Sequence, residues 1–556
     1  MNRNTEAHFA QIPKVNIQRS IFDKSFNLKT SFNMGSLIPI YAEEAIPGDT
    51  FTVDTALVLR TTSPLVKPVM DNLFLDIFYF AVPMRLVWKH FKEFMGENTS
   101  GPWTQKTEYT IPQITAPATT GWQKGTLADY FTIPTKVKGI SISALWARAY
   151  CLIWNEYFRD QNLQNPTQIN DGDSTYEGSN GGTLETDAQY YGKTLPVNKT
   201  HDYFTSCLPS PQKGQEVSLP LGNTAPIVST GSLWLTTKDA NPAPVKVMTS
   251  NTPTSPSGTG TMQYIVANKS QDNNNNSTTA NTLLHYYQGL ETDLSQATAA
   301  TINNLRQAFA IQSLFEKDAR GGTRYIELVK SHFGVTSPDA RLQRPEYLGG
   351  KRIPLNFQNV VQTSGTESSS GTQTTPQGNI SSYSHTTDED SSFTKSFTEH
   401  TMIIGLACVR TYHTYQQGIE RMFTRKRRFD FYWPALANLG EQPVKNKEIY
   451  AQGTNADEEV FGYQEAWAEY RYKPNKVTGQ MRSNAEGTLD LMHFADKYTN
   501  LPKLGQSWIQ ETKDNLDRCL AVPSTTSDQF MADIQFNVRA ARPMPTYSIP
   551  ATLGRN

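Results

Sequence analysis

The sequence predicts a mainly β fold, organised as a β-sandwich with long excursions between its strands. Apolar segments with strand periodicity recur along the chain, and long polar stretches separate them. Helical patterns are few and are inserted between strands rather than alternating with them. The chain has 556 residues, which is long for one core, since single cores stop growing at about 250–300 residues. We therefore expect two domains, or one domain with large insertions.

The first strands are expected between residues 33 and 83. A turn signal at residues 47–49 (PGD) precedes a segment in which apolar residues alternate and so share one face of a strand. The alternating residues are Phe51, Val53, Leu57 and Leu59. Residues 72–83 (NLFLDIFYFAVP) and 402–409 (MIIGLACV) are almost continuously apolar, which is typical of strands covered on both faces.

Three segments have helical spacing instead. Apolar residues repeat at helical intervals between Met84 and Met95, where Gly96 provides a stop, and again over residues 142–159. Asp293 with Gln296 forms an N-terminal cap pattern for a third helix. This helix is expected to end near Arg320-Gly321, and its apolar stripe consists of Ile302, Leu305, Phe309, Leu314 and Phe315.

Two polar stretches interrupt these patterns. Residues 223–282 are rich in Thr, Ser, Asn and Pro, and so long an irregular stretch is unusual inside a compact domain. We expect either disorder or an excursion with small hairpins, with strands at residues 232–236 and 262–266. The chain then divides into an N-terminal arm (1–30), the first part of the β fold (31–222), a surface insertion (223–282), a helix with a Gly/Arg-rich segment (283–362), a polar surface loop (363–398), and the last part of the β fold with an extended tail (399–556).

Composition narrows the functional classes. Lys and Arg together number 51 and Asp and Glu 52, which argues against a protein that coats nucleic acid by bulk positive charge. A local basic patch remains compatible with this balance. The 26 Phe, 25 Tyr and 9 Trp favour large interfaces, although a sizeable β core would also use them.

The four cysteines are Cys151, Cys207, Cys408 and Cys519, and they form no C-x-x-C pair. We expect buried, reduced thiols. The N-terminal residues contain no apolar segment of the kind found in secretory signals. No window approaches 18 uninterrupted apolar residues, so no membrane-spanning helix is expected.

No enzymatic signature is present: there is no phosphate-binding loop, no G-x-S-x-G elbow and no H-E-x-x-H helix. The nine histidines do not cluster at metal-ligand spacing, and His400 and His413 are interpreted as unrelated. No cofactor is expected. His385 with Asp388, Glu389 and Asp390 could offer oxygens to a hard cation, but a solvated acidic turn is the preferred interpretation.

The strongest basic run covers residues 421–428, and Phe429, Phe431, Tyr432 and Trp433 follow it. Arg425, Lys426, Arg427 and Arg428 are candidate DNA-facing residues, because single-stranded nucleic acid is bound by phosphate neutralisation and base stacking. The alternative is that the arginines bind carboxylates of a neighbouring subunit and the aromatics fill a core. The N-terminal arm allows the same two interpretations, since Lys24 and Lys29 are interleaved with Phe22 and Phe26.

Residues 318–350 form a Gly/Arg-rich segment bounded by the pairs Gly321-Gly322 and Gly349-Gly350. Glycine allows positive φ angles and close backbone approach, and arginine forks bind carboxylates or carbonyl oxygens. Pro338 and Pro345 prevent one long helix. Such a segment suits a subunit held in an assembly, and the candidate intersubunit residues are Arg320, Arg324, Arg341, Arg344 and Tyr347.

Within this segment, ARGGTRY, SHFGV and SPDARLQRPEYLGG resemble the major capsid proteins of the Microviridae, in the gokushovirus branch of single-stranded-DNA bacteriophages. The resemblance extends to residues 32–51, 70–97, 415–450 and 461–483, and it is lost in the two polar stretches. It implies an eight-stranded antiparallel jelly-roll β-barrel of the viral capsid type, with strand B near residues 33–62 and strand C near residues 72–83.

The resemblance also implies a function in a T=1 icosahedral shell of about 60 copies around a circular single-stranded DNA genome. The implied partners are an internal scaffolding protein, a DNA pilot protein and a small DNA-binding protein, with assembly in the host cytoplasm. The insertion at residues 223–282 would form a threefold protrusion that meets a host receptor. Its candidate attachment residues are Asn223, Trp234, Asn251, Tyr264 and Asn275.

Two other functions remain open at this point. A carbohydrate-active jelly-roll enzyme would need two carboxylates facing each other in a cleft. A host-binding, lectin-like spike would be supported only by residues 223–282, and it would not need the interface-like sequence elsewhere. The capsid interpretation includes the spike as one of its parts.

Overall fold

The computed structural model describes residues 18–97, 107–183, 186–214, 302–321, 325–334, 343–367 and 373–547, together with short pieces at 227–229, 234–235, 245–246, 290–292 and 370–371. The chain divides into two compact units, residues 1–213 with 316–556, and residues 214–315. We call them unit 1 and unit 2. Strands outnumber helices among the described residues, so the mainly β prediction is confirmed.

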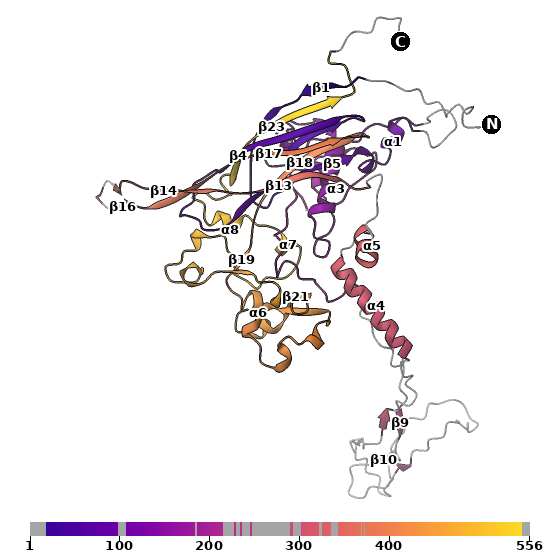
Figure 1. The fold of residues 1–556 in the computed structure, drawn as a ribbon, viewed down its shortest axis with the longest axis vertical. Coiled ribbons are helices and arrows are strands. Elements are labelled where there is room, and N and C mark those ends of the chain that lie inside the picture. The colour runs from indigo at the N-terminus through magenta and orange to yellow at the C-terminus, as the bar shows by residue number, and fades with distance from the viewer. Residues whose placement is uncertain are drawn as a thin grey trace, which may run out of the picture. The chain divides into compact units, whose positions relative to one another are not determined.

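A six-stranded antiparallel sheet forms one layer of unit 1 (Figure 1). Its order is β1-β23-β4-β17-β14, and β2 also pairs with β23. The strands are β1 (Ser20–Asp23), β2 (Phe26–Phe32), β4 (Thr50–Thr61), β14 (Phe357–Val361), β17 (Ile380–Ser396) and β23 (Phe530–Arg542). The part of the predicted N-terminal arm that the structure describes therefore belongs to this sheet.

A four-stranded antiparallel sheet has the order β13-β5-β18-β3. Its strands are β3 (Ile38–Ala45), β5 (Leu73–Pro83), β13 (Glu346–Pro354) and β18 (Thr401–Thr411). The largest apolar core contains side chains from both sheets, including Val53 and Phe536 from the six-stranded sheet and Ile77 and Val409 from the other. All four alternating residues that predict the first core face, Phe51 to Leu59, are buried in it.

Both continuously apolar strands are covered on two faces, as predicted. In β5, Ile77 belongs to the first core, whereas Phe80 belongs to a second core that also contains Ile404 of β18. Helix α3 (Leu145–Ile153) packs against the same face through Ala147 and Tyr150, and a π-helical turn continues it over Trp154–Phe158. This core explains why neither strand alternates in polarity.

Strand β17 occupies the second half of residues 363–398, the stretch predicted to be a polar surface loop. The sequence shows no apolar alternation here, because most of the buried side chains of this strand are polar. Ser382, Ser384 and Thr386 are each 1% exposed. Only Phe393 adds a large apolar side chain to the core. The ladder with β4 holds this strand in place through eleven paired positions with one irregularity.

The first two predicted helical segments contain helices that are shorter than their patterns. A single turn (η3, Met84–Leu86) and α1 (Phe91–Phe94) lie in the first helical segment, and Gly96 follows with a positive φ of 102°. Helix α4 (Ile302–Gly321) ends where predicted, while its expected cap at Asp293 lies outside the described residues. The remaining helices are α2 (Leu127–Tyr130), α5 (Tyr325–Phe333), α6 (Asn446–Ile449), α7 (Gln506–Ile509) and α8 (Asp514–Asp517).

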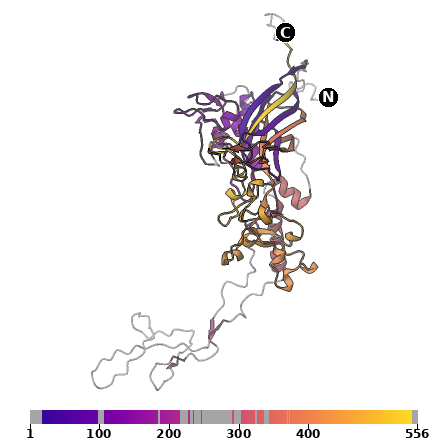
Figure 2. The same cartoon turned by 90° about the vertical axis from the view of Figure 1, so that its left-hand side faces the viewer.

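Residues 412–529 connect β18 to β23 and form a third apolar core with Tyr203 and Phe204 (Figure 2). The small strands in this connection are β19 (Thr414–Tyr415), β20 (Glu441–Lys445), β21 (Val460–Glu465) and β22 (Asn475–Lys476). Three more precede or follow α3 in the chain: β6 (Gln113–Thr115), β7 (Ser141–Ser143) and β8 (Tyr176–Glu177). Between β14 and β17, β15 (Thr366–Glu367) pairs with β16 (Gln373–Thr375). Unit 2 contains two strand pairs, β9 (Ile227–Ser229) with β12 (Leu290–Thr292), and β10 (Trp234–Leu235) with β11 (Val245–Lys246). Of the two strands predicted in the insertion, β10 falls inside residues 232–236, and residues 262–266 lie outside the described part.

All four cysteines are buried and unpaired. Burial raises the pKa of Cys151 and of Cys408 to about 12, and that of Cys519 to about 11. In the described part of the chain, no helix has the length and apolar character needed to cross a membrane.

Candidate assembly and nucleic-acid surfaces

The Gly/Arg-rich segment begins at the end of α4. The Arg320 guanidinium donates from Nε to the Glu441 carboxylate and from Nη2 to the Gly440 carbonyl oxygen, 3.3 Å away. The Glu441 side chain is 1% exposed, and burial raises the pKa of its carboxyl group. Arg320 therefore joins two segments of its own chain, and its predicted role between subunits stays a prediction.

The second glycine pair lies in β13, against strands on either side. A Cβ atom on Gly350 would lie 2.3 Å from the Ile77 carbonyl oxygen, and one on Gly349 would lie 2.4 Å from that of Ser392. Neither glycine has a positive φ angle. Close backbone approach, and not a positive φ angle, therefore explains why glycine stands at both positions.

The other candidate intersubunit residues have different environments. Tyr347 is 48% exposed, and its ring centroid lies 5.6 Å from that of Phe80. The Arg344 Nε atom is buried and has no hydrogen-bond partner among the described atoms. Arg324 and Arg341 lie outside the described residues.

The structure contains a buried ion cluster at Asp76 that was not predicted from the sequence. Arg352 of β13 donates to both Asp76 carboxylate oxygens, at 2.6 and 2.9 Å, and Arg410 of β18 donates from Nε at 2.9 Å. The Asp76 side chain is 3% exposed. A single acid inside the apolar run LFLDIFYF is the signal that could have indicated it, because a buried carboxylate needs a cation.

The basic run divides into two parts. Arg421 and Arg425 are largely buried and paired within the chain: Arg421 lies 2.7 Å from Glu448, and Arg425 lies 3.2 Å from Glu469. The glutamate carboxylates of the same chain therefore neutralise both guanidinium charges. Among the described residues, Arg425 is thus the one of the four candidate DNA-facing residues whose cation has a carboxylate partner.

The second part of the run is exposed. Lys426, Arg427 and Arg428 are exposed to solvent, and the Arg428 guanidinium lies 4.7 Å from the centroid of the Trp433 ring. Asp430 accepts backbone N–H bonds from Lys426 and Arg427, and these bonds lower the pKa of its carboxyl group. We call this part, with Phe429, Phe431 and Trp433, the basic-aromatic surface.

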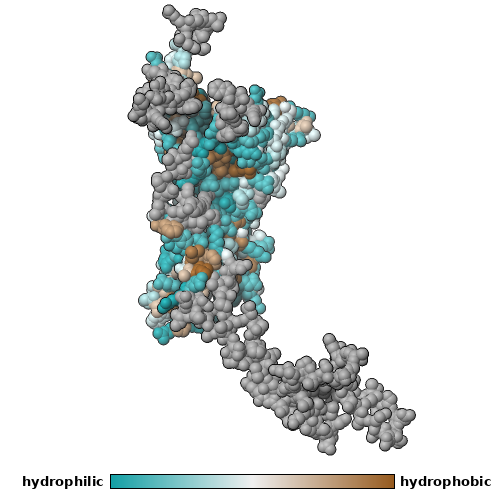
Figure 3. All heavy atoms as spheres, turned by 90° about the vertical axis from the view of Figure 1, so that its right-hand side faces the viewer, coloured by the Kyte–Doolittle hydropathy of each residue, from teal (hydrophilic) through white to brown (hydrophobic). Residues whose placement is uncertain are grey.

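Exposed apolar side chains form separate patches on a mostly hydrophilic surface (Figure 3). In the basic-aromatic surface, Phe429 is 70% exposed and Phe431 51% exposed. The interpretation that these aromatics fill a core therefore does not hold for the chain by itself. Such rings are available for stacking or for a neighbouring subunit.

The acidic candidates for a cation lie on β17. Asp388 and Asp390 share one face of the strand, whereas Glu389 points to the other. The Lys351 ammonium group lies 2.8 Å from the Asp388 carboxylate and 3.9 Å from that of Asp390. In the part of the chain that the structure describes, no three His, Cys, Asp or Glu side chains are grouped for a metal ion.

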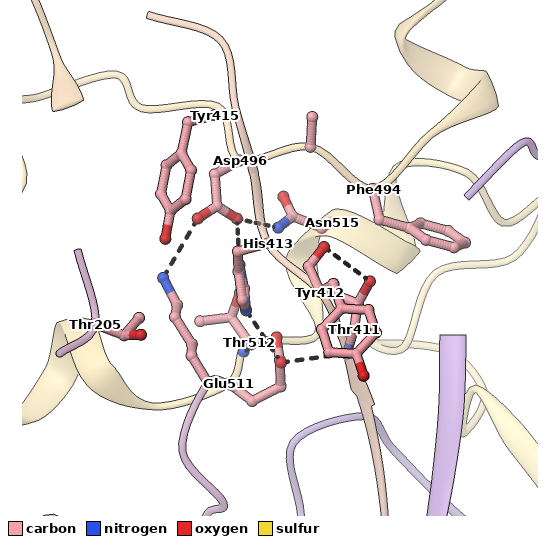
Figure 4. A network of polar contacts seen from close by, with 12 residues as sticks. Thr205, Thr411, Tyr412, His413, Tyr415, Phe494, Asp496, Glu511, Thr512 and Asn515 are labelled. Carbon is pink, nitrogen blue, oxygen red and sulfur yellow. Dashed lines mark hydrogen bonds and ion pairs between the residues drawn. The ribbon is translucent and has the colours of Figure 1, made fainter. Parts of the chain in front are cut away.

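His413, which follows β18, lies in a buried polar network (Figure 4). Its Nδ1 atom lies 3.0 Å from Asp496 and its Nε2 atom 3.1 Å from Glu511. Asn515 donates to Asp496 at 2.6 Å, and Lys199 forms an ion pair with it at 3.4 Å. Burial opposes the charge on His413, but the two carboxylates outweigh it and raise the pKa of His413 to about 10.

Of the five candidate attachment residues, only Trp234 falls in a described element, β10. Asn223, Asn251, Tyr264 and Asn275 lie outside the described residues.

Comparison with known proteins places the chain in a family. The family model described as capsid protein (F protein) matches residues 10–552. The chain is 42% identical to the capsid protein VP1 of Bdellovibrio phage phiMH2K, with 100% of this chain and 99% of that protein covered. It is 44% identical to the capsid protein VP1 of Spiroplasma virus 4, with 98% of both covered. Identity to the capsid protein VP1 of Chlamydia phage 1 is 40%, over 98% of this chain and 97% of that protein.

These relatives are structural proteins of virions, which rules out the enzyme interpretation and agrees with the resemblance found in the Gly/Arg-rich segment. Both the matched family and the full-length relatives lead to the same conclusion: this chain belongs to the capsid protein (F protein) family and is a major capsid protein of the Microviridae type.

Proposed function

We propose that this capsid protein folds as a jelly roll and that about 60 copies form a T=1 shell around a circular single-stranded DNA genome. The observation that carries the proposal is the nested pairing of the long strands in unit 1.

In chain order, the eight long strands are β2, β3, β4, β5, β13, β17, β18 and β23. The first pairs with the eighth, the second with the seventh, the third with the sixth and the fourth with the fifth. Rolling one long antiparallel hairpin into a sandwich produces this pairing, which is the jelly-roll arrangement.

This pairing changes two strand assignments that the resemblance suggested. Residues 33–62 contain two strands, β3 and β4, with the turn signal at residues 47–49 between them. They are the second and third strands of the proposed roll, and residues 72–83 contain the fourth. The first strand is β2, in the segment expected to be an arm.

The proposed mechanism is assembly through exposed aromatic side chains and arginines. Tyr347 offers an uncovered ring, and Arg344 is proposed to bind a carboxylate of a neighbouring copy. Arginine–carboxylate pairs would fix register, and closed symmetry would end growth. Arg324 and Arg341 are proposed for the same role.

The assembly proposal is tested on purified protein by mass photometry and negative-stain microscopy, with and without an added scaffolding protein. Uniform particles of about 60 subunits are expected. A monomer or trimer that persists with the scaffolding protein present would contradict the shell.

The basic-aromatic surface is proposed to face the packaged DNA, because its cations are exposed and stand beside exposed rings. Changing Lys426, Arg427 and Arg428 to Ala should lower the DNA content of intact particles. Arg425→Ala is the matched variant: because Arg425 is paired with Glu469, it should reduce stability more than DNA content. Normal DNA content in the triple variant would refute this role.

Residues 223–282 are proposed as the protrusion that attaches to the host, with Asn223, Trp234, Asn251, Tyr264 and Asn275 as its candidate contacts. Their composition and their position in a separate unit support this. The scaffolding protein, the DNA pilot protein, the small DNA-binding protein and assembly in the host cytoplasm belong to the same proposal.

A further inference from the structure

A pocket of about 500 Å³ opens between β19, the basic run and β22. Aromatic rings dominate its lining, with Tyr203, Phe204 and Tyr415 at its base and Phe423, Tyr470 and Tyr472 around it. Phe423 is 73% exposed and Tyr472 is 52% exposed. We call this the aromatic pocket. Its size is that of a binding site for several side chains.

Six of the charged side chains that line the aromatic pocket form three ion pairs within the chain. Three glutamates line it, and each has its own cation: Glu448 pairs with Arg421, Glu469 with Arg425, and Glu420 with Lys476. Lys473 and Arg482 also line the pocket and have no carboxylate partner among the described residues. Because most of its charges are paired and its lining is mainly aromatic, the pocket suits an occupant with apolar and ring-shaped side chains.

The C-terminal segment that follows β23 has that chemistry. Residues 543–550 read PMPTYSIP and include no charged residue. Tyr547 is 79% exposed and Met544 is 39% exposed, so their apolar surfaces are uncovered in the single chain. The three prolines fix φ and remove backbone donors, which favours an extended polyproline conformation and lowers the entropy cost of docking. Grooves lined by aromatic rings are the usual receptors for such segments.

The two features lie at opposite ends of unit 1. Thr546 bonds to Ser20 of β1, and β1 lies at the end of unit 1 opposite α6 and β21 (Figure 1). Residues 543–547 therefore lie away from the aromatic pocket of their own chain. A contact between unlike surfaces of two copies is heterologous, and such contacts build rings when the rotation closes.

We propose that the aromatic pocket receives residues 543–550 of a neighbouring copy of this chain, with Tyr547 as the anchoring side chain. This contact requires neighbouring copies of the chain, as the proposed shell does, but it does not require that the shell has T=1 symmetry. Single-stranded DNA in the same pocket is the competing occupant.

A binding experiment tests the proposal without requiring a shell. A fluorescent peptide of residues 541–550 is titrated with the unassembled full-length chain, and anisotropy is measured. We expect saturable binding that becomes at least tenfold weaker when the peptide carries Tyr547→Ala or the protein carries Phe423→Ala with Tyr472→Ala. Phe333→Ala removes an equally exposed ring outside the pocket and should leave binding unchanged. Equal binding by all variants would refute the proposal.

A cross-linking experiment tests it in particles. A photoreactive phenylalanine analogue replaces Tyr547 in shells assembled from a mixture of isotope-labelled and unlabelled chains, and mass spectrometry locates the adducts. Adducts with residues 415–423 or 470–482 of a second copy are expected. Adducts confined to other regions would overturn the proposal. The proposal would also be refuted if Phe423→Ala with Tyr472→Ala abolished the binding of a short oligothymidine but left the binding of the peptide unchanged. That result would assign the pocket to DNA.

Discussion

Asp76 holds two arginines from neighbouring strands, and its removal would leave their cations without an anion in a partly buried site. We predict that Asp76→Asn lowers the free energy of unfolding by about 3 kcal/mol. Asp533→Asn is the control, because the Lys29–Asp533 pair is exposed on both sides and should contribute less than about 1 kcal/mol. Denaturant titration of the unassembled protein measures both changes, and equal losses would contradict the assignment.

The environment of His413 predicts that the stability of the fold depends on pH. Its pKa rises from 6.5 to about 10 on folding, so the protonated form stabilises the fold fully below pH 6.5, and this contribution is lost as the pH rises toward 10. The melting temperature should therefore fall across that window. In His413→Gln this component should vanish, whatever the variant's overall stability. His201→Gln changes an exposed histidine and should keep the slope; an unchanged slope in His413→Gln would refute the prediction.

At the scale of elements, the approach of β13 to β5 depends on glycine. Gly350→Ala would place a methyl group against the Ile77 carbonyl oxygen, so the strands would have to separate. We predict a loss of about 1–3 kcal/mol, measured by thermal unfolding. Gly505→Ala is the matched control, because its backbone is extended and a Cβ atom there meets nothing within 4 Å. A neutral Gly350→Ala would show that the strands are not held at this distance.

The elements also show where the sequence was informative. Apolar alternation predicted β4, and continuous apolar runs predicted β5 and β18, because burial of apolar surface is what those strands contribute. Strand β17 was missed because its inward side chains are serine and threonine, whose hydroxyl groups pair locally instead of marking a core. The His413 network could not be predicted by spacing, since Lys199, Asp496 and Glu511 reach it from distant segments.

At the scale of the whole molecule, the division into two units makes a prediction about the insertion. Residues 223–281 lie within unit 2, so replacing them by a short linker should leave the melting temperature of unit 1 and particle formation nearly unchanged, and should abolish attachment to host cells. Differential scanning fluorimetry and a cell-binding assay measure the two effects. Failure to form particles would show that the insertion supports the shell.

The four cysteines have a practical consequence for the assembled particle. Each thiol is buried, and burial raises the pKa of Cys151 to about 12, so thiolate is scarce at neutral pH and maleimide reagents should leave the native shell unmodified. A cysteine introduced at an exposed position outside the surfaces proposed for assembly and DNA, such as Lys503, would then be the single reactive thiol of every subunit. The capsid would become a scaffold on which dyes or ligands are attached at one defined site per copy.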